Sequence, residues 1–237
     1  MLVVCLPTYN ERENLEAMVS ALGEVLPAEG RILVIDDNSP DGTGEIADRL
    51  AAERDDVDVL HRPRKEGLGP AYLAGFARAL ELGADLVVEM DCDFSHDPAD
   101  VPRLLTTAED TDLVLGSRYV RGGGTRNWGL VRRAISRWGS LYAQLILGLG
   151  VRDLTGGFKC YRRTVLETID LQAIRSKGYA FQIETTYRTL RAGFGVVEVP
   201  ITFVDREVGG SKMSKAIVLE AIWKVPALRL AAARGRL

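Results

Sequence analysis

The chain has 237 residues, of which 46% are hydrophobic and 27% charged, and its formal net charge is −3. This composition is that of a globular protein with a sizeable core, and it excludes an intrinsically disordered chain and a fibrous repeat. We expect a single domain over residues 1–237 and no nucleic-acid partner.

Short apolar runs alternate with amphipathic stretches through the first half of the chain. The runs predict buried parallel strands at residues 2–6, 32–35, 57–60, 86–90 and 113–115. The stretches between them predict helices at residues 15–25, 44–52, 70–82 and 101–107. This order predicts an α/β fold with a mostly parallel sheet and helices on both faces. Met1 leads directly into the first run without a charged leader, so we expect a cytoplasmic protein.

The second half of the chain differs from the first in composition and pattern. Residues 117–140 contain six arginines and no acidic residue, and apolar residues recur at helical spacing from about Trp128 to Leu149. Such a basic helix with tryptophans is typical of an element lying in a membrane interface, although a core-packed helix with a solvated arginine face has the same pattern. We expect a further helix at 179–190, a strand at 196–199, and a last helix at 214–233 interrupted by Pro226. No stretch is apolar enough to cross a bilayer.

Charge divides between the halves. Residues 1–113 hold 9 Lys and Arg against 25 Asp and Glu, a balance of −16, whereas residues 114–237 hold 21 against 8, a balance of +13. The split suggests a metal ion on one side and phosphates on the other, although two sets of solvated surface charges are the favoured explanation when the split is taken without the motifs. The three cysteines, Cys5, Cys92 and Cys160, are far apart and predict reduced thiols.

Polar residues follow the first, second and fourth predicted strands, where parallel sheets bind ligands. Asp91 and Asp93 could both reach a hard divalent cation that completes its shell with phosphate oxygens, with Ser95 adding a hydroxyl. Helix capping or a solvated turn is the alternative. His96 is more typical of a surface or capping residue than of a ligand. Neither a GxGxxG nor a P-loop motif occurs, which excludes the main signatures of dinucleotide dehydrogenases and P-loop NTPases.

The loops after the first two strands have groups suited to the neutral end of a nucleotide. Tyr9 can cover a base, and the carboxylates of Glu11, Asp36 and Asp37 can accept hydrogen bonds from base N–H groups and ribose hydroxyls. An Asx-type turn is the structural alternative for Asp36, Asp37 and Asp41.

Six ordered segments resemble the family 2 glycosyltransferases, and more narrowly the dolichol-phosphate (polyprenol-phosphate) mannose synthases. They are Pro7-Thr8-Tyr9-Asn10-Glu11, Asp36-Asp37-Asn38-Ser39-Pro40-Asp41, Gly67-Leu68-Gly69, Met90-Asp91-Cys92-Asp93-Phe94-Ser95-His96, Gly116-Ser117-Arg118-Tyr119 and Thr155-Gly156-Gly157-Phe158. The resemblance covers about residues 1–215. It implies a GT-A fold, a GDP-mannose donor, Mg²⁺ or Mn²⁺, and a polyprenyl monophosphate acceptor. It also implies a nucleotide-binding half at 1–116, an acceptor-side half at 117–215 and an amphipathic C-terminal helix at 216–237.

The resemblance assigns residues by position. Those matching the family's nucleotide contacts are Pro7, Tyr9, Glu11, Ile35 and Asp37. Asp91 and Asp93 match its metal and diphosphate ligands, with Ser95 at the third metal position. Cys92 belongs to the same substrate-binding segment, and in an extended chain its side chain points away from the aspartates and packs. The basic residues around the donor and acceptor phosphates match Arg118, Arg133, Arg206 and Lys212, with Arg132 as the alternative to Arg133.

These roles define an expected mechanism. A cation held by Asp91 and Asp93 stabilises the departing diphosphate. The acceptor phosphate, with a second pKa near ~6, needs positioning rather than a general base, and Arg118 and Arg133 could clamp it for an inverting attack. The basic segment from Arg206 to Lys212 is a candidate lid over the donor diphosphate, or else a mobile surface loop.

The sequence leaves other functions and the means of anchoring open. Transfer of glucose or another sugar from a UDP-sugar is one alternative, a phosphohydrolase with Asp91 as nucleophile and Asp93 as acid is another, and a non-catalytic nucleotide sensor at a membrane is the third. Some relatives carry transmembrane helices and others recruit membrane subunits. We expect peripheral contact with the cytoplasmic face of a membrane, with a separate anchoring protein as a candidate partner.

Overall fold

A seven-stranded sheet forms the centre of the computed structural model, which describes residues 1–176, 178–205 and 215–235. The order of its strands is β3-β2-β1-β4-β7-β5-β8. Their bounds are β1 Leu2–Thr8, β2 Gly30–Asp36, β3 Val57–His61, β4 Leu86–Glu89, β5 Leu113–Ser117, β7 Lys159–Arg162 and β8 Val196–Pro200. All pairs are parallel except those of β7, which runs antiparallel to β4 and β5. The predicted α/β fold with a mostly parallel sheet is therefore confirmed.

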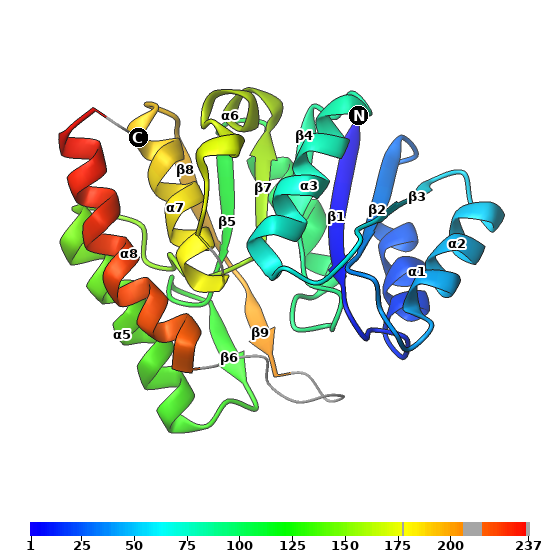
Figure 1. The fold of residues 1–237 in the computed structure, drawn as a ribbon, viewed down its shortest axis with the longest axis horizontal. Helices are drawn as coiled ribbons and strands as arrows, with labels where there is room; N and C mark the ends of the chain where they lie inside the picture. Colours follow the sequence, from blue (N-terminus) through cyan, green and yellow to red (C-terminus); the bar gives the residue numbers. More distant parts are fainter. Residues whose placement is uncertain (177, 206–214, 236–237) are drawn as a thin grey trace.

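Helices cover both faces of this sheet (Figure 1). Side chains alternate along β1, so that Val3 and Cys5 face one layer while Val4 and Leu6 face the other. The first layer contains α3 Leu68–Glu81, α6 Arg163–Thr168 and α7 Gly178–Arg191. The second contains α1 Leu15–Val25, α2 Thr43–Glu53 and α4 Val101–Thr107. Because both faces are covered, the central strands are apolar throughout, which is why their sequence pattern is so clear.

Two long helices extend the fold at one end. α5 Leu130–Leu147 and α8 Lys215–Ala233 lie side by side, with the Tyr142 hydroxyl donating to the Ile222 carbonyl oxygen at 2.8 Å (Figure 1). The expected interruption at Pro226 is wrong, because α8 continues through it. Val225 and Leu228 are buried in the core on either side, and this packing offsets the hydrogen bond that proline removes. Among the described residues, no helix is both long and apolar enough to span a membrane.

Several short elements were not predicted. β6 Gly124–Arg126 and β9 Thr202–Val204 form a separate two-stranded parallel sheet. Two 3-10 helices, Pro98–Asp100 and Leu171–Ala173, and the helix α6 complete the chain.

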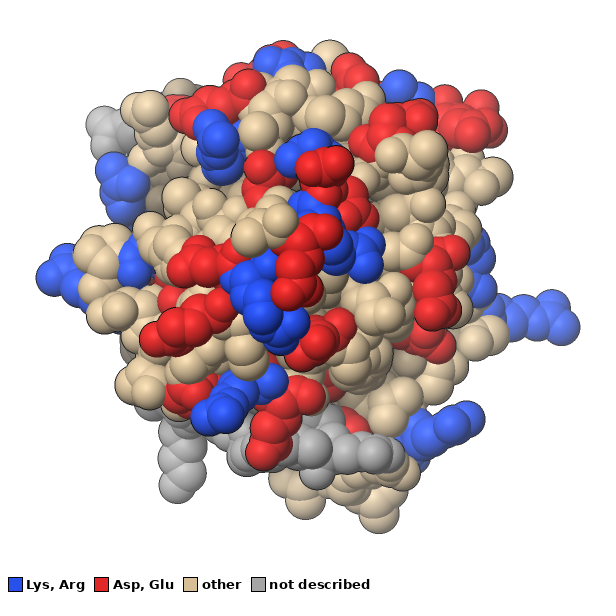
Figure 2. Space-filling view, turned by 90° about the vertical axis from the view of Figure 1, so that its right-hand side faces the viewer, with Lys and Arg blue, Asp and Glu red and all other residues tan. Residues whose placement is uncertain are grey.

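The surface of the acidic half carries charges of both signs. Figure 2 shows basic and acidic side chains interleaved on the side of the molecule with α2 and β3. Arg49, Arg31 and Arg54 pair there with nearby carboxylates. Part of the acidic charge in the first half therefore belongs to solvated surface ion pairs, which is the alternative explanation of the charge split.

Candidate active site at the carboxyl ends of the strands

Three loops follow the carboxyl ends of β1, β2 and β4, and each contains one residue with a left-handed backbone conformation. Asn10, Asn38 and Phe94 have φ values of 58°, 57° and 57°. The Asp37 amide donates to the Thr8 carbonyl oxygen at 3.1 Å, which joins the first two loops. A bulky residue such as Phe94 rarely adopts this conformation, and such strain, about 1–3 kcal/mol, gathers at functional sites.

The β1 loop holds the predicted nucleotide contacts in place. Glu11 is buried and its Oε2 accepts from Asn14 Nδ2 at 2.9 Å. Tyr9 is half-buried, with Lys65 Nζ 3.8 Å from the centre of its ring. Pro7 pairs with Ile35 across β1 and β2. The Ile35 side chain is fully buried in the core, so only its backbone can face a nucleotide.

The acidic residues of the β2 loop divide into two roles. Asp36 accepts from the Ser39 amide at 3.2 Å and from its hydroxyl at 2.6 Å, and Asp41 accepts from the Thr43 hydroxyl at 2.6 Å. These two carboxylates stabilise turns, as the structural alternative predicted. Asp37 instead pairs with Arg62. Burial raises the pKa of Asp37 above its ordinary value, and the Arg62 guanidinium opposes that rise.

The carboxylates of Asp91 and Asp93 lie in the loop after β4. Asp91 is half-buried, whereas Asp93 is buried. Tyr72 Oη, on α3, donates to Asp91 Oδ1 at 3.1 Å, and the Ser95 amide donates to Asp93 Oδ1 at 3.1 Å. Cys92 between them is buried in the core, where packing places it.

The acidic pair fits a cation that takes further ligands from a phosphate. In the part of the chain that the structure describes, no group of three or more His, Cys, Asp or Glu side chains could hold a metal by itself. Asp91 and Asp93 supply two hard oxygen ligands, and Mg²⁺ is commonly held by one or two carboxylates together with substrate phosphates. Ser95 is buried beside them.

His96 is buried, so the expected surface position is wrong. Its Nδ1 accepts the Asp91 amide at 3.2 Å, and its ring stacks on Phe158 at a centroid distance of 4.9 Å. Burial lowers the pKa of His96 to about 4, so the imidazole is neutral at physiological pH.

Arg118 lies just beyond β5 in a buried ion pair that the sequence analysis did not foresee. Its Nε and Nη2 donate to Asp153 Oδ2 and Oδ1 at 2.7 and 2.6 Å, and Nη2 also donates to Thr155 Oγ1 at 2.9 Å. Burial by itself would lower the pKa of Arg118, but the Asp153 carboxylate raises it above its ordinary value. The same contact lowers the pKa of Asp153 despite its burial.

The two arginine candidates on α5 face different surroundings. Arg133 is exposed, and its Nη2 donates to the Thr125 carbonyl oxygen at 3.2 Å. Arg132 pairs with Asp205 at 2.5 Å and lies 4.3 Å from the Trp128 ring. Arg206 and Lys212 lie outside the described residues.

Arg132 and Trp128 line a pocket of about 430 Å³ between α5, α7 and α8. The rest of its wall includes Ile135, Trp138, Tyr142, Thr155, Ile183 and Ile222. Trp128 Nε1 and Arg132 Nε are buried without a hydrogen-bond partner among the described residues. The mostly apolar wall of the pocket therefore includes two residues whose buried N–H groups have no acceptor among the described residues. The geometry favours Arg132 over Arg133 as the residue facing this pocket.

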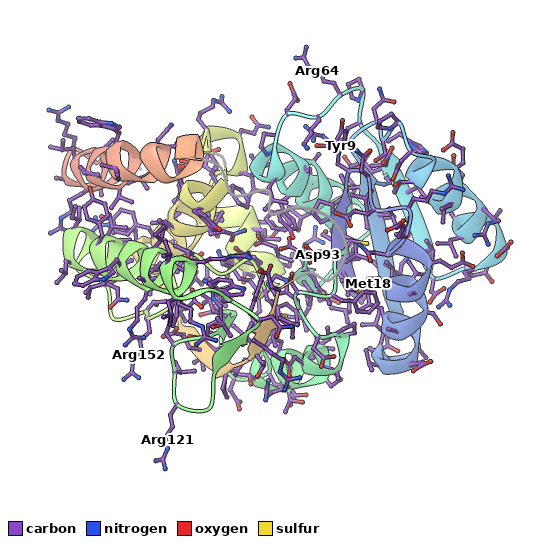
Figure 3. All side chains as sticks on the ribbon, turned by 90° about the horizontal axis from the view of Figure 1, so that it is seen from below. Tyr9, Met18, Arg64, Asp93, Arg121 and Arg152 are labelled. Carbon is purple, nitrogen blue, oxygen red and sulfur yellow. The ribbon has the colours of Figure 1, made fainter. Side chains whose placement is uncertain are left out.

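Aromatic rings connect the pocket to the acidic pair. Phe203 on β9 contacts the His96 ring at 5.2 Å and the Trp128 ring at 5.2 Å, both edge-on. Arg118 Cζ lies 5.5 Å from the same Phe203 ring. Figure 3 looks onto this end of the sheet, with Asp93 between the β1 side, marked by Tyr9, and α5. Asp91, Asp93, Arg118 and Arg132 thus belong to one end of the molecule.

Comparison with known proteins gives the family. The family model for Glycosyl transferase family 2 matches residues 3–170. The chain is 53% identical over 227 residues to an undecaprenyl-phosphate mannosyltransferase of Micrococcus luteus, covering 96% of this chain and 93% of that one. It is 51% identical over 237 residues to a polyprenol monophosphomannose synthase of Mycolicibacterium smegmatis, covering 99% and 88%. The chain belongs to glycosyl transferase family 2.

Solved structures agree on the fold. Glucosyl-3-phosphoglycerate synthase of Mycobacterium tuberculosis, solved with Mn²⁺, UDP-glucose and phosphoglyceric acid, superposes with a TM-score of 0.71 at 22% identity. The match covers 97% of this chain and 79% of that one. The expected GT-A fold is therefore confirmed for this family 2 glycosyltransferase.

Three residues at the site were missed from the sequence. Tyr72, which contacts Asp91, lies in an ordinary amphipathic pattern and gives no signal. Trp128 marks the start of a predicted helix, and an N–H group without a partner has no sequence signature. Asp153 did carry a signal, since it is one of few acidic residues in the basic half and precedes Thr155-Gly156-Gly157 by two positions.

Proposed function

We propose that this family 2 glycosyltransferase transfers mannose from GDP-mannose to a polyprenyl monophosphate with inversion. The pocket carries the proposal, because a largely apolar wall that also includes the Arg132 guanidinium and the Trp128 indole suits a long isoprenoid chain with an anionic headgroup. The names of the two mannosyltransferase relatives support the same substrate class.

The donor occupies the acidic half in this proposal. Tyr9, Glu11 and Asp37 contact the nucleoside, and Pro7 and the Ile35 backbone border it. Asp91 and Asp93 would hold Mg²⁺ or Mn²⁺, with Ser95 beside them, and the fold relative solved with Mn²⁺ supports a divalent cation. When bound, that cation offsets the charge that develops on the departing diphosphate. Arg206 and Lys212 remain the predicted contacts to the donor phosphates.

The acceptor enters the pocket with its phosphate at the polar end. Trp138, Tyr142 and Ile222 border the path of the chain, while Trp128 Nε1 and Arg132 meet the phosphate. The Arg118 guanidinium is held by Asp153, so we place it as a fixed charge that orients Thr155 toward the pocket. Arg133, on the outer face of α5, is left to attract the anionic acceptor at longer range.

The acceptor phosphate needs orientation more than activation. A phosphate monoester with a second pKa near ~6 is mostly dianionic at neutral pH, so its oxygen is already a nucleophile. Hydrogen bonds from the pocket place that oxygen behind the anomeric carbon, and charged donors reduce its repulsion from the donor phosphates. Direct attack converts an α-linked donor into a β-linked product.

The outer faces of α5 and α8 suit contact with a lipid surface on the cytoplasmic side. Leu130, Val131, Leu145 and Leu230 are exposed there, beside the arginines of α5. Exposed apolar residues next to basic ones are the pattern of peripheral membrane helices. A separate anchoring protein could cover the same surface. Sedimentation with vesicles containing anionic lipid separates these cases, because direct contact requires no added protein.

The test uses purified protein with labelled GDP-mannose or UDP-glucose and a short polyprenyl phosphate. We expect a mannosyl lipid and little glucosyl lipid. A glucosyl lipid alone would change the donor, release of free phosphate from phosphoesters without sugar transfer would revive the phosphohydrolase, and nucleotide binding without turnover would indicate a sensor.

Two tryptophan variants connect the activity to the pocket. Trp128→Phe keeps an aromatic ring but removes the unpartnered N–H, and we expect the KM for the lipid to rise about tenfold, the equivalent of one hydrogen bond to a charged group. Trp223→Phe is the matched control, because Trp223 is 77% exposed and does not line the pocket. Equal effects of the two substitutions would argue against the pocket as the acceptor site.

A further inference from the structure

We infer that His96 is a positioning residue that fixes the backbone of Asp91 and thereby the carboxylate that meets the donor diphosphate and its cation. This inference rests on the proposed function, since it concerns the same acidic pair. It gives a role to a residue that the proposed mechanism does not use.

The hydrogen bond from Asp91 to His96 forms just after the end of β4. The Met90 amide still donates to the Cys5 carbonyl oxygen, at 3.3 Å, but Asp91 lies beyond the strand pairing. A backbone amide that leaves a sheet is held in one position only if another acceptor replaces the strand pairing, and the Asp91 N–H is half-buried beneath the loop. His96 Nδ1 supplies this acceptor at 3.2 Å across a tight loop. The proton of the neutral ring therefore resides on Nε2.

The imidazole cannot turn away from this contact. Phe158 stacks against one face at 4.9 Å with an interplanar angle of 20°, and Phe203 meets its edge at 5.2 Å with an angle of 83°. The His96 side chain is 1% exposed. A side chain packed on two sides presents its acceptor atom in a single position, which is what positioning a neighbour requires.

β9 fixes the other end of the same loop. The Val204 amide donates to the Ser95 carbonyl oxygen at 3.2 Å, while the Ser95 amide donates to Asp93 Oδ1. Phe94 between these anchors has a left-handed backbone, φ 57°. A strained residue persists only where its surroundings hold it, so the loss of the His96 acceptor should let the loop relax and move Asp91.

The test compares two polar substitutions that differ in one atom position. Asn at 96 places an oxygen near the position of Nδ1, whereas Gln places its amide near Nε2. Both remove the aromatic ring, and Gln fills more of its space than Asn, so packing alone would favour Gln. His61→Asn is the control at the other histidine of the chain, which pairs with Asp48 on the surface of β3. Binding of Mn²⁺ is measured by electron paramagnetic resonance with GDP present and no acceptor, so that no turnover is needed.

We expect His96→Gln to weaken Mn²⁺ binding by about tenfold or more, the effect typical of residues that orient a metal ligand, and His96→Asn to restore most of it. His61→Asn should bind as the unsubstituted protein does. Equal affinities for the Asn and Gln variants would overturn the positioning role while leaving the proposed function intact. Absence of any Mn²⁺ binding by the unsubstituted protein would instead overturn the metal site, and this inference with it.

Phe203→Leu tests the same idea if both substitutions at 96 prevent folding. It keeps the hydrogen bond from the Asp91 amide to His96 and loosens the packing of the imidazole, together with the Phe203 contact to Trp128 in the pocket wall. We expect a smaller loss of Mn²⁺ affinity, about threefold. An affinity equal to that of the unsubstituted protein would contradict the inference.

Discussion

Asp153 holds Arg118 in a buried, bidentate ion pair, with N···O distances of 2.7 and 2.6 Å between residues 35 positions apart in the sequence. The arginine that the sequence assigned to the acceptor phosphate is therefore occupied within the protein. Under the proposed function we therefore expect the headgroup to meet Trp128 and Arg132 instead; Arg132 also pairs with Asp205, but its Nε and Trp128 Nε1 have no hydrogen-bond partner among the described residues.

Removal of Asp153 should be strongly destabilising. Asp153→Ala leaves the Arg118 guanidinium buried without its counter-charge, and breaking a buried pair in this way typically costs about 3–5 kcal/mol of unfolding free energy. Urea denaturation followed by circular dichroism measures it. Arg49→Ala, which breaks an exposed pair with Glu16, should leave the denaturation midpoint nearly unchanged. A midpoint shift no larger for Asp153→Ala would contradict the structural role.

Asp93→Asn should separate activity from stability. The amide oxygen can still accept the Ser95 N–H that Asp93 Oδ1 accepts at 3.1 Å, so the loop should keep its shape. The negative charge is lost, and we expect turnover to fall at least about 100-fold, as when one group that stabilises developing charge is removed. Turnover of GDP-mannose and the thermal unfolding temperature are measured together. Normal activity with this substitution would exclude a role for the carboxylate.

The central sheet could be predicted because its strands are buried on both faces. Residues such as Val3, Val4 and Ile32 give continuous apolar runs, and the period of the helices between them is clear. β6 and β9 have only three residues each and are half-exposed, so Gly124-Thr125-Arg126 shows no pattern. The antiparallel direction of β7 is a property of the tertiary connection and leaves no mark on Lys159-Cys160-Tyr161-Arg162.

The sequence predicts the site residues only where they lie close together in the chain. Asp91 and Asp93 are two residues apart on one loop, and a spacing of that kind can be read from the sequence. The contacts of Asp91 to Tyr72 and of Arg118 to Asp153 join segments far apart in the chain. Such pairs depend on how the strands and helices are arranged, and a single sequence does not specify them.

Gly123 should be sensitive to substitution and its neighbour should not. A Cβ at Gly123 would lie 2.4 Å from the Ser117 carbonyl oxygen and 3.1 Å from the Arg118 carbonyl carbon, whereas one at Gly124 would meet nothing within 4 Å. Because backbone atoms cannot move aside cheaply, Gly123→Ala should lower the unfolding free energy by about 1–3 kcal/mol. Urea denaturation of Gly123→Ala and Gly124→Ala provides the comparison. Equal midpoints would mean that the turn before β6 adapts without cost.

A buried polar network behind the acidic pair includes a lysine without any exposure. Lys159 Nζ donates to the Gln182 carbonyl oxygen at 2.9 Å and to Thr185 Oγ1 at 3.1 Å. Glu89 lies opposite Lys159 across β4 and β7. Burial lowers the pKa of Lys159 to about 8, although the Glu89 carboxylate opposes that change.

This pKa predicts how stability changes in alkaline solution. Between about 8 and 10.5 the unfolded chain binds a proton on Lys159 that the folded protein does not, so the unfolding free energy should rise with pH across that window. Below pH values of about 8, Lys159 is protonated in both the folded and the unfolded protein, so the free-energy cost of burying its charge lowers the unfolding free energy in full. Lys159→Met has no such proton, and its stability relative to the unsubstituted protein should therefore decline from pH 8 to pH 10. Guanidinium denaturation of both proteins at several pH values measures this difference, and a difference that stays constant would show that Lys159 keeps its proton when folded.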